Sequence, residues 1–178
     1  ALFFLSFAQA KALSELAVND PDTIKAKLTK EAKTKVQNAL KGFPGIDIAL
    51  FGRMVADDPS LNTDACAQVA HSISTHKVNN EYDYFTAVDD MAPEDNAGAG
   101  HIGTVEFNSS TLYRYATVAV HELYRQLGGD TAEAVNGFVR AFVCSMPTGK
   151  QNTFANRTLP DAVLVTLRTD QPINLVGA

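Results

Sequence analysis

The sequence predicts a single mixed α+β domain over residues 1–178, and three observations support this. Helix-like and strand-like segments alternate along the chain, without an internal repeat or a linker. The chain has 178 residues, 46% of them hydrophobic, which suits one domain with a sizeable core. No apolar run approaches the ~20 residues that a membrane-spanning helix requires, so no membrane partner is expected.

The first 42 residues are predicted to form a strand and two helices. ALFFLSF (1–7) is typical of a buried strand, and AQAKALSELA (8–17) of a short helix. A longer helix is expected between Pro21, which favours a helix start, and Gly42, which favours a stop. Its apolar residues share one side. Its lysines lie near the opposite side, as on a solvated face: Lys27, Lys30, Lys33 and Lys41.

Two strands and a loop are predicted in the next third of the chain. GIDIALFGRM (45–54) indicates a strand, because Ile46 and Ile48 alternate with small or polar residues. Residues 55–64 are polar and indicate a loop. Most of 65–78 again alternates between apolar and polar side chains, as in a strand.

An acidic, Gly-rich hairpin is predicted at 76–107. Tyr84 and Phe85 stand among carboxylates where the chain leaves a strand-like segment. A Gly/Ala run and a second strand-like segment follow. The tip of this hairpin, at 92–101, is expected to be mobile.

The last third of the chain adds strands and helices in turn. A helix over 130–146 has Asp130 as its expected N-cap and Glu133 at the capping-box position. The other predicted elements are a strand at 111–120, a short helix at 121–129, a polar loop at 147–158 and a strand at 161–169.

The charge is distributed unevenly along the chain, whose net charge is −5. Residues 1–46 carry seven basic and four acidic side chains, residues 47–106 two and eleven, and residues 107–178 six and five. This distribution suits a protein with a nucleic-acid groove beside a self-complementary protein contact. It also suits a soluble acidic protein with one solvated Lys-rich helix. Cys66 and Cys144 do not indicate a disulfide framework, which favours the reducing cytoplasm.

Motifs for catalysis or cofactor binding are incomplete. HELYR has Arg125 where a zinc protease motif needs a second His, and Gln151 replaces the Ser/Thr of a P-loop. No metal or cofactor is therefore predicted. One enzymatic alternative stays open, a metal-dependent nuclease with two metal ions held by aspartates. Adjacent aspartates are also common in turns. The residues concerned are Asp57, Asp58, Asp89 and Asp90.

A binding surface is the alternative to catalysis. Aromatic side chains on an exposed arm can stack on nucleobases, a contact worth ~1–3 kcal/mol for each base. Phe85 could instead anchor the hairpin on the domain. Arg53 and Met54 place a cation and a flexible apolar side chain at the end of a predicted strand. A polar loop offers groups for phosphates and base edges, at Lys150, Asn152, Phe154 and Arg157.

Five motifs follow one another in the chain: FGRM, AHSISTHKV, YFTAVDD, GAGHIGT and GKQNTFA. With the sequence around them, they resemble the CasC-type backbone subunit of the type I-E CRISPR Cascade complex. The resemblance covers most of the chain, and this order of motifs is highly specific. It implies a non-enzymatic subunit whose copies polymerise along the CRISPR RNA. The implied partners are that RNA, the target DNA strand paired to it, further copies and other Cascade subunits.

The resemblance also implies a fold and a set of contacts. The fold is an RRM-like (ferredoxin-like) palm with a helical insertion at about 8–42 and a thumb hairpin at about 76–107. The thumb would cross the guide–target duplex and reach a neighbouring copy. Its residues at a displaced nucleotide would be Tyr84, Phe85 and Thr86, with Met54 as the partnering wedge. Arg53 and Lys150 are candidate phosphate contacts, and Gln151, Asn152 and Phe154 complete the predicted nucleic-acid site.

One departure from the family concerns the ends of the chain. Family members carry additional residues before the position of Ala1, including the first palm strand, and others after Ala178. The chain is therefore expected to be a fragment without that strand.

Overall fold

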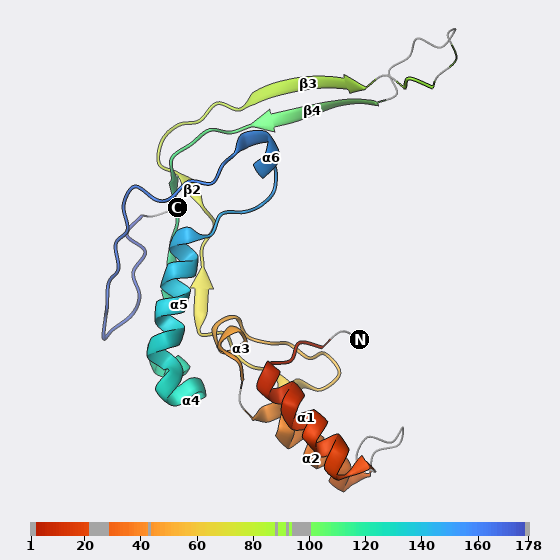
Figure 1. Ribbon diagram of the computed structural model, residues 1–178. Coiled ribbons are helices and arrows are strands. Elements are labelled where there is room, and N and C mark those ends of the chain that lie inside the picture. Colours follow the sequence, from red (N-terminus) through yellow and green to blue (C-terminus); the bar gives the residue numbers. More distant parts are fainter. Residues whose placement is uncertain are drawn as a thin grey trace. The chain divides into compact units, whose positions relative to one another are not determined.

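The computed structural model describes residues 3–21, 29–42, 44–87, 89–91, 93 and 101–176. It contains helices and small antiparallel sheets, so the predicted α+β class is confirmed (Figure 1). Two compact units are present. The first comprises residues 1–69 and 116–173, and the second residues 70–115 and 174–178.

The first unit begins with α1 (Phe7–Asn19). A capping box starts this helix: Ser6 Oγ accepts from the Gln9 N–H at 3.1 Å, and Gln9 Oε1 accepts from the Ser6 N–H at 3.2 Å. The strand predicted at 1–7 is wrong for the described residues, since residues 3–6 form no strand and the cap at Ser6 starts a helix at Phe7. The helix predicted at 8–17 is confirmed.

The helix α2 (Lys30–Lys41) lies beside α1 (Figure 1). Its N-cap is Thr29, whose Oγ1 accepts from the Ala32 N–H at 3.2 Å. The predicted long helix is therefore confirmed over α2. Residues 22–28, which the prediction also covered, lie outside the described residues.

The strand predicted at 45–54 is wrong, because this segment forms the helix α3 (Ile46–Phe51). Six residues with Asp47 among apolar side chains fit either period, and the sequence alternation misled the prediction. Gly52 ends the helix with φ 77°, a conformation that favours glycine. A Cβ there would also lie 2.8 Å from the Thr63 carbonyl oxygen. The chain then pairs Arg53 with Thr63 in an isolated antiparallel bridge.

The two predicted strands at 65–78 and 111–120 are each broken in two. In the first unit, β1 (Ala67–Val69) pairs antiparallel with β6 (Ala116–Val118). In the second unit, β2 (Ile73–Ser74) pairs antiparallel with β5 (Leu112–Tyr113). The predicted loop at 55–64 is present, with the 3₁₀ turn η2 (Pro59–Leu61) inside it. Each sheet of the described residues is two-stranded, and the RRM-like palm stays a prediction.

The predicted helices of the last third are confirmed as α4 (Val120–Leu127) and α5 (Thr131–Cys144), joined by η3 (Gly128–Asp130). The capping box predicted at Asp130 is wrong. The chain enters α5 directly from η3, so Asp130 already has helical dihedrals, and its side chain makes no cap hydrogen bond. Instead, Thr131 Oγ1 donates to the Gly128 carbonyl at 2.7 Å.

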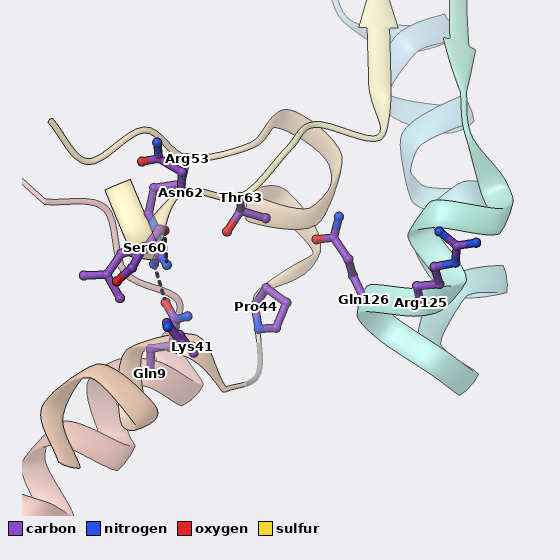
Figure 2. Close-up of a pocket in the computed structure, with 10 residues that line it drawn as sticks. Gln9, Lys41, Pro44, Arg53, Ser60, Asn62, Thr63, Arg125 and Gln126 are labelled. Atoms are coloured by element: carbon purple, nitrogen blue, oxygen red, sulfur yellow. Dashed lines mark hydrogen bonds between the residues drawn. The ribbon is translucent and has the colours of Figure 1, made fainter. Parts of the chain in front are cut away.

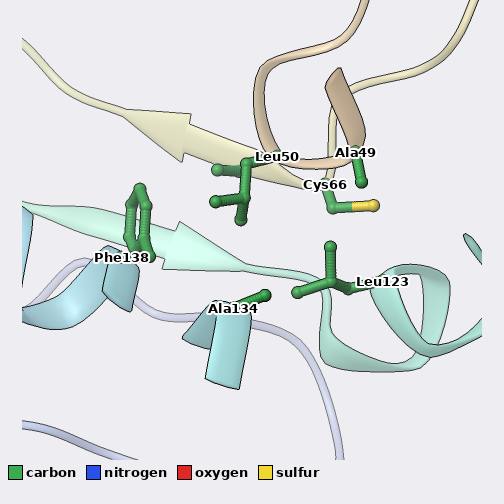
Figure 3. Packing of buried hydrophobic residues seen from close by; sticks show 7 residues of the cluster. Ala49, Leu50, Cys66, Leu123, Ala134 and Phe138 are labelled. Atoms are coloured by element: carbon green, nitrogen blue, oxygen red, sulfur yellow. The ribbon is translucent and has the colours of Figure 1, made fainter. Parts of the chain in front are cut away.

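The core of the first unit forms where α3, β1, α4 and α5 meet (Figure 3). Leu123 of α4 lies in this cluster with no exposed surface. Because α3 is a helix, Ala49 and Leu50 both reach the cluster. The other members are Cys66, Ala67, Ala134 and Phe138.

The last part of the first unit has little regular structure. The predicted polar loop contains one helical turn, α6 (Gln151–Phe154). The strand predicted at 161–169 is wrong, since these residues join no sheet of the described chain. Their apolar side chains are exposed. A strand-like pattern forms a strand only where its side chains pack on neighbouring strands or on the core, and these residues have no such contact in the described chain. None of the described helices has the length and apolar character needed to cross a membrane.

The predicted hairpin is confirmed in the second unit. It consists of β3 (Glu81–Ala87) and β4 (His101–Phe107), which form a long antiparallel pair (Figure 1). Of the predicted mobile tip at 92–101, only 93 and 101 are described, and His101 already belongs to β4. The mobility of the tip stays a prediction, because most of the tip lies outside the described residues.

Candidate nucleic-acid interface

The register of the hairpin places Tyr84 and Phe85 on opposite faces. Tyr84 pairs with Thr104, and Phe85 pairs with Gly103. Successive side chains of a strand point to opposite sides, so these adjacent aromatics cannot enter the same gap from one face. Tyr84 is 63% exposed and Phe85 39% exposed. Thr86 shares the face of Tyr84.

Phe85 packs on its own hairpin. Its ring covers Gly103 so closely that a Cβ on that glycine would lie 2.6 Å from Phe85 Cζ. The His101 ring lies beside it, with 5.6 Å between the ring centroids. Phe85 therefore fills the space of a missing side chain on the opposite strand, as an anchor of the hairpin does.

Tyr82 is an exposed aromatic that the sequence prediction omitted. It pairs with Glu106 and lies two residues before Tyr84 on the same strand, so the two tyrosines share a face. The prediction chose Tyr84 and Phe85 because they are adjacent in sequence. The period of two in a strand was the signal that would have found Tyr82.

Arg53 lies inside the first unit and is only 8% exposed. Its guanidinium has five N–H groups, and all of them donate within the described residues. The nearest acceptor is Gln9 Oε1, at 2.9 Å from Nη1 (Figure 2). The other acceptors are the carbonyl oxygens of Phe4, Leu40 and Leu61.

Through this network Arg53 holds distant segments of the chain together, which is a structural role. Gln9, which it contacts, also donates to the Leu40 carbonyl at 2.6 Å, so both side chains tie α1 to the end of α2. The Phe3 ring lies 5.1 Å from the guanidinium carbon. Burial lowers the pKa of Arg53 from its ordinary value. A phosphate would reach this guanidinium only by displacing acceptors that it already has.

Met54, the next residue in the chain, is 83% exposed. Together with the exposed Phe51 it lines an open cavity of about 380 Å³. Gly52 and Thr63 also line this cavity. The hydrogen bonds of the buried Arg53 hold the backbone next to Met54 in place. The exposed Met54 side chain therefore starts from a fixed position.

The loop with α6 presents most of the remaining predicted contacts. Lys150 and Asn152 are exposed. Gln151 Oε1 is occupied, because Arg157 Nε and Nη2 donate to it at 3.1 and 2.9 Å. Phe154 ends the helical turn and is partly exposed. This loop and Met54 belong to the first unit, and the hairpin residues belong to the second.

The aspartates of the nuclease alternative fall in both units. Asp58 accepts from Ser60 Oγ and Gln37 Nε2, each at 2.7 Å, and these bonds, that of Ser60 foremost, lower the pKa of Asp58. Asp89 accepts from the Met91 N–H at 2.9 Å. Nowhere in the described ranges do three or more His, Cys, Asp or Glu side chains gather as a metal site would need.

Comparisons with known proteins find one family and several structures. The family profile described as CT1975-like protein matches residues 1–178. No curated protein matches the chain. A chain of a CRISPR RNA-guided surveillance complex in a pre-nicking state is 36% identical with a TM-score of 0.80, over 98% of this chain and 49% of the other.

A second structure, also a CRISPR RNA-guided surveillance complex, has a chain that is 33% identical with a TM-score of 0.63. The match covers 97% of this chain and 58% of the other. The present chain therefore spans about half of the length of the chains that it resembles.

Proposed function

The chain belongs to the CT1975-like protein family, and from this membership we propose that it is an RNA-binding backbone subunit of a CRISPR surveillance complex of the Cascade type. The observation that carries the proposal is the match to a surveillance-complex chain with a TM-score of 0.80 over 98% of this chain. Copies of the subunit polymerise along the CRISPR RNA in the cytoplasm and have no catalytic role. The two units correspond to an RRM-like palm and its thumb.

The hairpin β3–β4 meets the guide paired to target DNA. Tyr84 and Thr86 form the face that contacts the displaced nucleotide, because Tyr84 is exposed and Phe85 is held on Gly103. An unstacked base offers a planar surface on which a tyrosine ring can stack. Phe85 lies on the other face of the hairpin. Its contact with Gly103 holds β3 and β4 together behind Tyr84 and Thr86. Met54, from a second copy of the chain, is the partnering wedge.

The loop with α6 contacts the RNA backbone. Lys150 supplies a positive charge, and Gln151, Asn152 and Phe154 supply donors and an apolar surface next to it. Contacts of this kind fix the position of a nucleic acid without reading its sequence. Sequence specificity then comes from base pairing between the guide and the target DNA. Arg53 acts on this site only indirectly, through the fold that its hydrogen bonds support.

The proposal predicts that bound copies increase in steps with RNA length. The chain is titrated with single-stranded RNAs of increasing length in EDTA, and bound copies are counted by native mass spectrometry. A filament-forming subunit gives a ladder whose highest copy number grows with the RNA. One copy at every length, or no binding at all, would contradict the proposal. The titration is repeated with Mg²⁺ in place of EDTA. RNA cleavage in this second titration alone would favour the nuclease instead.

The two hairpin aromatics are expected to differ in their effects. Tyr84→Ala should weaken target DNA binding by a reconstituted complex about 5- to 150-fold, the loss of one stacking contact of ~1–3 kcal/mol. Amide hydrogen exchange in β4 should not change, because Tyr84 is exposed. Phe85→Ala should accelerate exchange in β4, since Gly103 loses its cover.

Tyr84→Phe is the matched control, because it keeps the ring and should bind the target as the unaltered chain does. The assigned faces are wrong if Phe85→Ala alone weakens target binding and leaves exchange in β4 unchanged.

A further inference from the structure

We infer that Arg157 is a positioning residue, which holds the turn from Lys150 to Phe154 in the shape that contacts RNA phosphates. The inference rests on the proposed function, since it concerns the same loop. A basic residue in such a loop would be expected to contact a phosphate directly. The inference assigns Arg157 the different role of holding the turn.

Arg157 is connected to the turn at three points. Its Nε and Nη2 donate to Gln151 Oε1 at 3.1 and 2.9 Å, and its backbone N–H donates to the Ala155 carbonyl at 2.9 Å. A guanidinium has its donors in a rigid fork, so two bonds to one oxygen fix the direction of the Gln151 side chain. The fork therefore links the end of the loop to the first residue of α6.

The turn needs such support because its backbone is unfavourable on its own. Lys150 has φ 58° and Ala155 has φ 49°, both in the left-handed region that side chains with a Cβ seldom adopt. Between them α6 has only four residues, which is too short for a stable isolated helix. Its backbone bonds run from the Phe154 N–H to the Lys150 carbonyl at 3.0 Å and from the Ala155 N–H to the Gln151 carbonyl at 2.8 Å.

The fork also decides which groups of Gln151 are available to a ligand. The amide oxygen accepts from Arg157, and a guanidinium cannot accept in return, so the amide nitrogen of Gln151 must be the group that faces away. Gln151 then offers only N–H donors, and Lys150 beside it offers only ammonium donors. Two sets of donors next to each other suit the oxygens of a phosphodiester.

The test separates the hydrogen bonds of Arg157 from its charge. Arg157→Lys keeps the charge and loses the fork, and Arg157→Gln loses both. If Arg157 positions the turn, both variants bind single-stranded RNA about tenfold more weakly, the effect of one charge-assisted hydrogen bond. The dependence of log affinity on log salt concentration then keeps its slope in both.

A direct phosphate contact gives a different result. Arg157→Lys would then bind nearly as well as the unaltered chain, and Arg157→Gln would reduce the salt slope by about one phosphate. That outcome overturns the inference. Arg168→Lys is the matched control, because Arg168 donates to its own neighbours Asp170 and Gln171 and should leave affinity unchanged.

A second measurement does not need RNA. In the free chain, Arg157→Lys should accelerate hydrogen exchange at the Phe154 and Ala155 amides about tenfold, and Arg168→Lys should not. Unchanged exchange at both amides would overturn the inference. If the unaltered chain fails to bind RNA while exchange accelerates, the proposed function fails and the positioning of the turn by Arg157 stands.

Discussion

Replacing Arg53 with methionine is expected to lower the free energy of unfolding by about 2–4 kcal/mol. Methionine fills much of the same space but donates no hydrogen bond. The Leu61 carbonyl would then lose both N–H groups that Arg53 donates to it, and Gln9 Oε1 would keep only the Ser6 N–H. A lost hydrogen bond to a charged group costs ~1.5–3 kcal/mol, and a buried group left unsatisfied ~1–3 kcal/mol. Urea denaturation followed by circular dichroism measures the change.

Arg53→Lys is the control for charge. An ammonium has three donors on one atom and cannot reach acceptors on α1, α2 and η2 together, so we expect an intermediate loss of stability. RNA affinity should fall in both variants only to the extent that the folded fraction falls. Unchanged stability with a large loss of RNA affinity would instead make Arg53 the phosphate contact that the sequence predicted.

Leu123→Ala is expected to have a comparable or larger effect, a loss of about 2–5 kcal/mol in the free energy of unfolding. Leu123 has 0% exposed surface and lies between α3, β1 and α5 in the core (Figure 3). Truncation removes buried apolar surface and leaves a cavity that these elements cannot close completely. Domains have a total stability of ~5–15 kcal/mol, so this one change would remove a large share.

Tyr124→Ala is the matched control for Leu123→Ala. It lies next in the same helix, is exposed, and should change the free energy of unfolding by less than about 1 kcal/mol. Thermal denaturation of both variants makes the comparison. Equal losses in the two variants would contradict the prediction, because they would show that burial of Leu123 in the core adds nothing to the free energy of unfolding.

The sequence predicted those elements whose signals are local. The helix α2 was expected because its apolar residues share one side and Gly42 marks its end. The hairpin β3–β4 was expected because strand-like segments flank an acidic, Gly-rich stretch. The five motifs also indicated the family, since their order along the chain needs no structure to be read. The segment at 45–54 failed because six apolar and polar residues fit a strand and a helix equally well, and only the core selected α3.

Composition and periodicity thus determined the α+β class, the hairpin and the candidate loop. Only the tertiary structure decided what the candidate residues can reach. Arg53 and Met54 are neighbours in sequence, yet one is buried and the other exposed, because the acceptors of Arg53 come from distant segments at Phe4, Gln9, Leu40 and Leu61. In the same way, pairing with Gly103 on the opposite strand turned Phe85 into a hairpin anchor and left Tyr84 exposed. Contacts between distant segments depend on how the chain packs, and a local pattern of residue types does not specify that packing.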